Sequence, residues 1–192
     1  LNRDSIGHKI NLPLSAVGRA YLAFCNKNEC TIILAKLRKS RNMANKIVHH
    51  GLANNLIKEL KNIDLIKPEV FFNKETRFDF LLEKNKQKIF IEVKNVTLFR
   101  DKSTAEFPDA VTTRGSKHLL TLIEAIKKGY KTYLLFLVQI QNMEHFKIAK
   151  DIDIEYYKNY LLAKKAGVNF LAYRCKISDK KINIEKKLKI IS

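Results

Sequence analysis

The sequence predicts an α/β protein in which helices flank a central mixed sheet. Two runs of β-favouring residues, 77–83 and 89–96, are separated by the polar residues 84–87, a pattern that predicts a β-hairpin. A continuous apolar run at residues 133–138 has the length of one strand, as expected for a strand buried on both faces. Helical apolar spacing before and after these strands predicts a sandwich of helices around the sheet.

Apolar spacing and turn signals place the remaining elements. Residues 46–62 carry apolar side chains at helical spacing and predict an amphipathic helix. Thr112 or Thr113 is expected to cap a second helix that runs to Lys128, and Gly129 is expected to end it. The order is completed by a strand at residues 69–73, a loop at 97–108, a strand at 130–139, a helix at 152–166 and strands at 168–177 and 181–190.

Length and charge limit the function classes. The chain has 192 residues, of which 46% are hydrophobic, so it is long enough to bury one sizeable core. Its net charge of +18 favours a polyanionic partner, most simply a nucleic acid, because such a field attracts phosphates. The alternative is that the abundance of Lys, Ile and Asn reflects the nucleotide composition of a genome rather than a binding surface.

Cysteine usage and hydropathy indicate a cytoplasmic protein. Cys25, Cys30 and Cys175 are odd in number and contain no CxxC pair, so they predict neither a disulfide framework nor a zinc site. No uninterrupted apolar run is long enough to span a membrane, and no signal peptide is visible. The first residue, Leu1, indicates a fragment, an alternative start or a trimmed chain.

The predicted hairpin carries the candidate chemistry. A turn centred on Asn85 and Lys86 sets Asp79 opposite Glu92, and strand alternation puts Glu92 and Lys94 on the same face as Asp79. Two facing carboxylates repel unless a cation lies between them, and Mg²⁺ prefers carboxylate oxygens. Lys94 could then polarise an attacking water, so the pattern indicates metal-assisted hydrolysis of a phosphodiester. The alternative is an ordinary solvated strand face with an incidental ion pair.

Four segments resemble one known family. The segments RFDFLLE at residues 77–83, IEVKNVTL at 91–98, FPDAVTTRGSKH at 107–118 and LAYRC at 171–175 resemble, in order and spacing, the sugar fermentation stimulation (SfsA) family. The resemblance covers residues 46–192 and implies a DNA-binding protein with a restriction-endonuclease-like core of the PD-(D/E)xK type. It implies that Asp79, Glu92 and the Val93 carbonyl hold Mg²⁺ or Mn²⁺, with Lys94 as the catalytic lysine.

Further candidates surround this predicted centre. The family resemblance makes Glu59, on the helix predicted at residues 46–62, and Asp109 candidates for additional acids, although Glu59 could equally be a surface residue. Arg114, Lys117 and His118 lie in the first turns of the predicted second helix, where the helix dipole and exposed N–H groups favour anions. They predict a clamp for the nucleic-acid backbone. The alternatives are a solvated basic turn and, for His118, a hydrogen-bonded structural role.

Residues 1–45 differ in character from the rest of the chain. Helical composition at residues 16–25, AVGRAYLAFC, and a second short helix at 28–37 predict a short helical appendage. Residues 1–40 resemble part of the effector-binding domain of IclR-type transcription regulators. The SfsA resemblance implies a β-barrel ahead of the nuclease-like part, but nothing before residue 68 alternates like barrel strands, so no barrel is predicted. Two domains are predicted, at 1–45 and 46–192, either as a fusion joined near residues 40–46 or with a diverged native amino-terminal segment.

The leading functional hypothesis is a Mg²⁺-dependent, DNA-acting nuclease-like domain. One alternative is a non-catalytic DNA-binding regulator of sugar metabolism genes, and another is a truncated fusion product without activity. Tyr156, Tyr157 and Tyr160 could stack on bases, but aromatic residues at this helical spacing commonly pack against a core instead. No membrane partner is expected.

Overall fold

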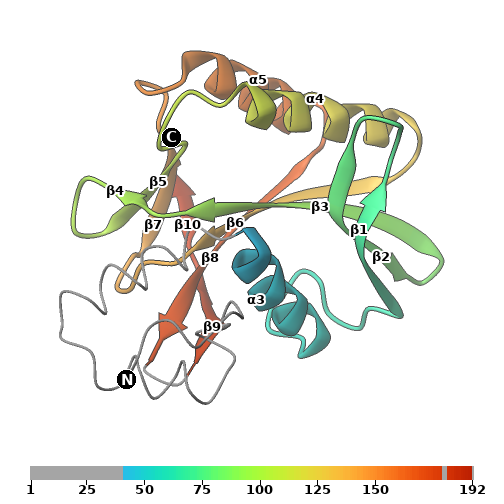
Figure 1. Cartoon of the computed structure of the whole chain (residues 1–192), viewed down its shortest axis with the longest axis horizontal. Coiled ribbons are helices and arrows are strands. Elements are labelled where there is room, and N and C mark those ends of the chain that lie inside the picture. Colours follow the sequence, from blue (N-terminus) through green and yellow to red (C-terminus); the bar gives the residue numbers. More distant parts are fainter. Residues whose placement is uncertain (1–40, 179–180, 192) are drawn as a thin grey trace, which may run out of the picture.

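The computed structural model describes residues 41–178 and 181–191, which form three helices and two sheets (Figure 1). The larger sheet has the order β1-β2-β3-β6-β8-β9 and the smaller one the order β10-β7-β5-β4. The two short helices predicted within residues 1–40 lie outside the described residues. None of the helices in the described ranges has the length and apolar character that crossing a membrane requires.

The sequence predicted the bounds of the inner strands of the larger sheet closely, and those of its two edge strands less closely. The strands of this sheet are β1 Leu65–Phe71, β2 Arg77–Lys84, β3 Gln87–Val96, β6 Lys131–Val138, β8 Asn169–Ile177 and β9 Ile182–Lys187. Strands β3, β6 and β8 are parallel neighbours, whereas β1, β2 and β9 join the sheet in antiparallel pairs. The predicted mixed sheet is therefore confirmed. Pro68 lies in β1, at the sheet edge, where a residue without an N–H donor is tolerated.

Helices cover both faces of this sheet. Helix α3, Arg41–Ala53, packs on one face, and helices α4, Thr113–Lys127, and α5, Ile154–Lys165, cover the other (Figure 1). The apolar side chains form two separate buried clusters, one beneath α3 and one beneath α4 and α5. The predicted α/β sandwich is confirmed, and strand β3 runs through its centre between the two layers of helices.

Helix α4 follows its predicted boundaries. The hydroxyl of Thr112 accepts a hydrogen bond from the Gly115 N–H at 3.0 Å, which makes Thr112 the N-cap. Gly129 has a φ of 86°, a left-handed conformation that lets the chain leave the helix without the strain that a side chain would bring. The start of α4 is thus fixed by local sequence, and this start lies beside the candidate site described below.

Three predictions about the fold were wrong. The strand predicted at 181–190 is interrupted at Leu188, so that its first part joins the larger sheet and its last part the smaller one. The helix predicted at residues 46–62 ends at Ala53, because Asn55 adopts a φ of 54° and turns the chain. Ile57 and Leu60 remain buried, so their helical spacing reflected burial in an irregular segment. The loop predicted at 97–108 contains two strands of a second sheet, which comprises β4 Leu98–Phe99, β5 Thr104–Phe107, β7 His145–Ile148 and β10 Lys189–Ile191.

The tyrosines of helix α5 are mainly structural. Tyr156 and Tyr160 are 0% and 6% exposed, so neither ring presents a free face to a base. Tyr160 contacts the ring of Phe170 at 4.5 Å between centroids, and Tyr156 contacts Phe107 at 5.3 Å. The packing interpretation is therefore confirmed for these two residues.

Candidate active site

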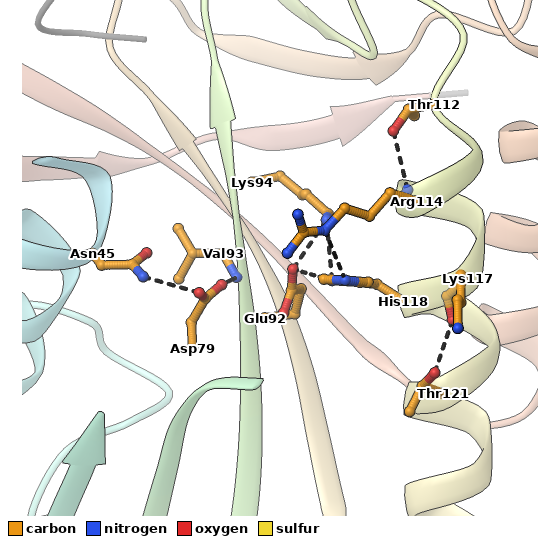
Figure 2. Close-up of polar contacts among 11 residues, drawn as sticks. Asn45, Asp79, Glu92, Val93, Lys94, Thr112, Arg114, Lys117, His118 and Thr121 are labelled. Carbon is orange, nitrogen blue, oxygen red and sulfur yellow. Dashed lines mark hydrogen bonds and ion pairs between the residues drawn. The ribbon is translucent and has the colours of Figure 1, made fainter. Parts of the chain in front are cut away.

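Strand β3 positions a buried pair of opposite charges. Glu92 and Lys94 are two residues apart and project from one face of β3 toward helix α4 (Figure 2). The Lys94 ammonium lies 3.0 Å from Oε1 of Glu92, and the exposed fraction of the glutamate residue is 1%. A charged carboxylate this deeply buried is costly unless it is paired, so the fold stabilises Glu92 through Lys94.

A histidine from helix α4 completes this cluster. Nδ1 of His118 contacts the same Oε1 atom of Glu92, and Lys94 Nζ lies 3.5 Å from Nδ1. Because a carboxylate only accepts hydrogen bonds, the His118 ring donates from Nδ1, and its Nε2 accepts from Arg114 Nε at 3.5 Å. His118 is 6% exposed. It is placed as a hydrogen-bonded structural histidine, and its predicted grip on the nucleic-acid backbone does not fit this position.

The surroundings of Glu92 keep its carboxyl group ionised. Burial by itself raises the pKa of Glu92, but the charge of Lys94 and the hydrogen bond from His118 lower the pKa more strongly. The net result is a pKa below the ordinary value for glutamate. Glu92 is therefore a carboxylate at neutral pH, the protonation state that a metal ligand requires.

Asp79 departs from the predicted geometry. The hairpin register is as predicted as far as the pair Phe80 and Ile91. The predicted shared face is wrong, however, because Asp79 turns toward the α3 side of β3 while Glu92 and Lys94 lie on the α4 side (Figure 2). Phe78 and Phe80 are two residues apart yet pack into different clusters, so the alternation of β2 breaks at Asp79.

The two acids still lie at one peptide group. Oδ2 of Asp79 accepts a hydrogen bond at 2.8 Å from the Val93 N–H, which belongs to the peptide that joins Glu92 to Val93. Its Oδ1 accepts from Nδ2 of Asn45 on helix α3 at 2.9 Å. The exposed fraction of Asp79 is 1%. Asp79 and Glu92 therefore approach the same peptide of β3 from opposite sides rather than facing each other across the hairpin.

The oxygen atoms here suit a hard divalent cation. Among the residues that the structure describes, Oε2 of Glu92 and Oδ1 of Asn45 are buried without a hydrogen-bond partner. Buried oxygens are rarely left unsatisfied, and Mg²⁺ and Ca²⁺ take carboxylate and amide oxygens as ligands. Within the described ranges no three His, Cys, Asp or Glu side chains gather in a metal-binding group, so backbone oxygens and water would have to complete the shell. Asn45 was missed by sequence reasoning, because nothing in its spacing links it to the hairpin.

Of the predicted additional acids, Glu59 is bound by residues of other strands and Asp109 lies at the surface. Glu59 follows helix α3 rather than lying on it, and its two oxygens are held by Tyr173 Oη at 2.6 Å and by Lys187 Nζ at 2.5 Å. These partners belong to β8 and β9, beyond β6 from β3. Asp109 is exposed in the segment between β5 and α4, whereas Glu92 is buried.

The Glu59 contact predicts an effect on stability. Tyr173→Phe removes the hydroxyl that donates to Glu59 and accepts from the Lys58 N–H, so we expect a loss of about 1–3 kcal/mol in unfolding free energy, measured by urea denaturation. Burial raises the pKa of Glu59, but the hydrogen bonds from Lys187 and Tyr173 bring it below its ordinary value. A carboxyl group whose pKa is lower in the folded than in the unfolded state stabilises the fold at pH values above its unfolded pKa. This stabilisation is lost as the pH falls through the folded pKa. The difference between variant and wild type should therefore shrink in acid, and a difference independent of pH would contradict this role.

An open pocket lies next to the buried cluster. Arg114 and Lys117 of α4 line it with His118, together with residues of the β1–β2 hairpin that include Phe71 and Arg77. Lys117 pairs with Glu75 at 2.7 Å, and Arg114 is exposed and makes no ion pair with an acid among the described residues. The structure thus places two of the three predicted clamp residues on a solvent-facing surface beside the Glu92 site.

Comparisons with known proteins agree with this fold. Residues 42–181 match the SfsA family, described as the sugar fermentation stimulation protein RE domain. The chain is 70% identical over 171 residues to the sugar fermentation stimulation protein homolog of Pelagibacter ubique, an alignment that covers 86% of this chain and 74% of that protein. It superposes on the solved structure of Pyrococcus furiosus SfsA in complex with Ca²⁺ with a TM-score of 0.73 and 27% identity, over 79% of this chain and 65% of that one.

The comparisons also bear on the amino-terminal segment. The homolog from Pelobacter propionicus is 37% identical over 188 residues, which is 97% of this chain and 80% of that protein. Most of residues 1–45 must lie within that alignment, and no comparison supports the resemblance to a regulator fragment. Because the family model spans most of the chain and the Pelagibacter homolog is 70% identical, this chain belongs to the SfsA family.

Proposed function

We propose that the chain acts as a divalent-metal-dependent hydrolase of phosphodiester bonds in DNA. The observation that supports this proposal is the buried, ionised Glu92, which has one oxygen without a hydrogen-bond partner in the described structure and an ammonium group on its other oxygen. Asp79 lies on the other side of the same peptide, with Asn45 hydrogen-bonded to it. The Ca²⁺ in Pyrococcus furiosus SfsA is consistent with a divalent site in this fold.

Each residue has a distinct role in the proposed reaction. Glu92 would hold a divalent cation, Mg²⁺ or Mn²⁺, through its unpaired oxygen, and Asp79 with the Val93 carbonyl would complete the site once the Asp79 carboxylate turns from the α3 side of β3 toward Glu92. The cation would supply Lewis-acid stabilisation of the negative charge that develops on the phosphate. Lys94 lies beside Glu92 at 3.0 Å, so its ammonium would orient the attacking water and neutralise charge on a phosphate oxygen. His118 holds Glu92 in place, so we assign it a positioning role.

The substrate backbone would bind at the start of helix α4. Arg114 and Lys117 are exposed on the first turns of this helix, where the dipole of a helix and its free N–H groups favour an anion. Arg114 in particular has no acid partner among the described residues, so its guanidinium is available to a phosphate. The net charge of +18 would increase the rate of encounter with DNA at low salt.

Nicking of DNA tests the proposal directly. Supercoiled plasmid and circular single-stranded DNA are incubated with the protein in Mg²⁺, Mn²⁺, Ca²⁺ or EDTA, and products are separated on agarose gels. We expect cleavage in Mg²⁺ or Mn²⁺ and none in EDTA, and we expect Glu92→Gln to abolish it. Salt-dependent binding without cleavage in either metal would contradict the nuclease and favour a DNA-binding regulator without catalysis. If the protein neither binds nor cleaves DNA, the result would favour the remaining alternative, a truncated fusion product without activity.

Metal binding can be measured apart from catalysis. Isothermal titration of Ca²⁺ into the protein is expected to show saturable binding that is weakened at least about tenfold in Glu92→Gln, because the variant removes a charged ligand from a hard-cation site. Ca²⁺ should likewise raise the thermal midpoint of the wild-type protein but not that of the variant. Glu83→Gln, on neighbouring strand β2, is the matched control, and equal Ca²⁺ affinity in Glu83→Gln and Glu92→Gln would remove Glu92 from the metal site.

A further inference from the structure

The β1–β2 hairpin presents an aromatic ring to solvent. Phe71, at the end of β1, is 67% exposed, although large apolar side chains gain free energy when they are removed from water. The next residue, Phe72, packs against the rings of Phe78 and Phe90 at centroid distances of 5.5 and 5.6 Å. Because successive side chains of a strand point to opposite faces, anchoring Phe72 in the core forces Phe71 outward.

The turn that follows holds this ring in a fixed position. The Phe72 N–H donates to the Thr76 carbonyl at 2.9 Å, and the side-chain oxygen of Asn73 accepts from the N–H groups of Glu75 and Thr76 at 2.9 and 2.7 Å. The backbone on both sides of the hairpin tip is therefore hydrogen-bonded. Phe71 is a rigid, exposed platform rather than part of a loose loop.

A guanidinium group lies over the platform, and a shared pocket connects the platform to the candidate active site. The Arg77 guanidinium lies over the Phe71 ring at 5.7 Å from its centroid, and both residues line the same pocket as Arg114 and His118. His118 in turn contacts Glu92. The pocket thus brings the exposed Phe71 ring together with Arg114 and with His118, the residue that contacts the buried carboxylate.

We propose that Phe71 is a stacking subsite for an unpaired base of the nucleic acid whose backbone reaches Glu92, an inference that rests on the proposed function. Exposed aromatic rings beside cations are the arrangement that binds single strands, because every base has a face that can stack and every nucleotide carries a phosphate. In a duplex, neighbouring base pairs already cover both faces of each base. The preferred substrate class is therefore single-stranded DNA or a DNA end or flap with unpaired nucleotides.

Binding in EDTA tests the subsite without cleavage. Fluorescence anisotropy compares a short oligothymidine, an abasic strand of the same length and a blunt duplex. Phe71→Ala is expected to weaken binding of oligothymidine about tenfold, to leave the abasic strand and the duplex nearly unchanged, and to be rescued by Phe71→Trp. Phe99→Ala is the matched control, because Phe99 is also an exposed phenylalanine, at 53%, but lies on β4 of the other sheet and does not line the pocket.

The possible outcomes separate this inference from the proposed function. Equal oligothymidine binding by Phe71→Ala and Phe99→Ala, an equal loss on the abasic strand, or no single-strand binding by the wild-type protein would overturn the subsite. A base-dependent loss in Phe71→Ala together with no metal-dependent nicking would keep the subsite and refute the nuclease. If nicking depends on Glu92 but is unchanged by Phe71→Ala, the nuclease is kept and the stacking subsite is refuted.

Discussion

Replacement of Lys94 is expected to reduce metal-dependent nicking about 1,000-fold while DNA binding stays within a few-fold of wild type. The Lys94 ammonium is 3.0 Å from Glu92 and lies within the buried cluster, so it is in place to act on charge that forms only during the reaction. Removal of one such group from a water-excluded site costs about 100- to 1,000-fold in rate, and loss of the group that orients the attacking water puts the expected loss at the upper end of this range. The rate of appearance of nicked plasmid measures the effect.

The choice of variant matters because the lysine also neutralises a buried acid. Lys94→Ala leaves Glu92 with His118 alone, and an unpaired buried charge destabilises a protein by about 3–5 kcal/mol. Lys94→Arg keeps the positive charge but changes its shape and reach, so it is expected to fold and still lose most of the activity. Lys88→Ala, on the same strand but exposed, is the matched control and should cleave at the wild-type rate.

Three results together decide the role of Lys94. A folded Lys94→Arg that binds DNA but does not nick it supports a catalytic role. Wild-type nicking by Lys94→Arg would mean that any cation beside Glu92 suffices, and that Lys94 only stabilises the fold. Loss of nicking in Lys88→Ala as well would point to a general electrostatic effect of removing lysines rather than to the site.

The hairpin and its acid–lysine pair could be predicted because local sequence fixes them. Asn85 and Lys86 take positive φ values of 49° and 65°, as in the two-residue turns that set hairpin register, and alternation then puts Glu92 and Lys94 on one face. The cap at Thr112 and the stop at Gly129 are equally local. These features needed no knowledge of the rest of the chain.

Non-local contacts decided the features that sequence reasoning missed. Asp79 turns toward Asn45, which is 34 residues away on a helix that starts at Arg41 rather than at residue 46 as predicted, and no alternation pattern carries that information. His118 meets Glu92 across 26 residues. The second sheet is built from strands of two to four residues, too short to show periodicity, and each is stabilised by partners elsewhere in the chain.

The second sheet leads to another large expected effect, on stability. Phe136 of central strand β6 is 0% exposed, and its ring lies 5.6 Å from that of Phe107 on β5 and 4.2 Å from that of Phe146 on β7. It therefore joins the smaller sheet to the larger one. Phe136→Ala is expected to lower the free energy of unfolding by about 3–5 kcal/mol, because a large cavity would remain between the sheets. Urea denaturation followed by far-UV circular dichroism measures this loss.

Two further variants decide whether packing between the sheets is the cause. Phe136→Leu retains most of the apolar volume and should lose only about 1–2 kcal/mol, whereas exposed Phe99→Ala should change stability by less than about 0.5 kcal/mol. Equal losses in Phe136→Ala and Phe99→Ala would contradict the packing of the sheets at this position.

Strand β5 leads directly into the segment that starts helix α4, so a loosened second sheet should also shift His118 away from Glu92. Phe136→Leu is therefore expected to weaken Ca²⁺ binding slightly as well, although its side chain lies outside the metal site.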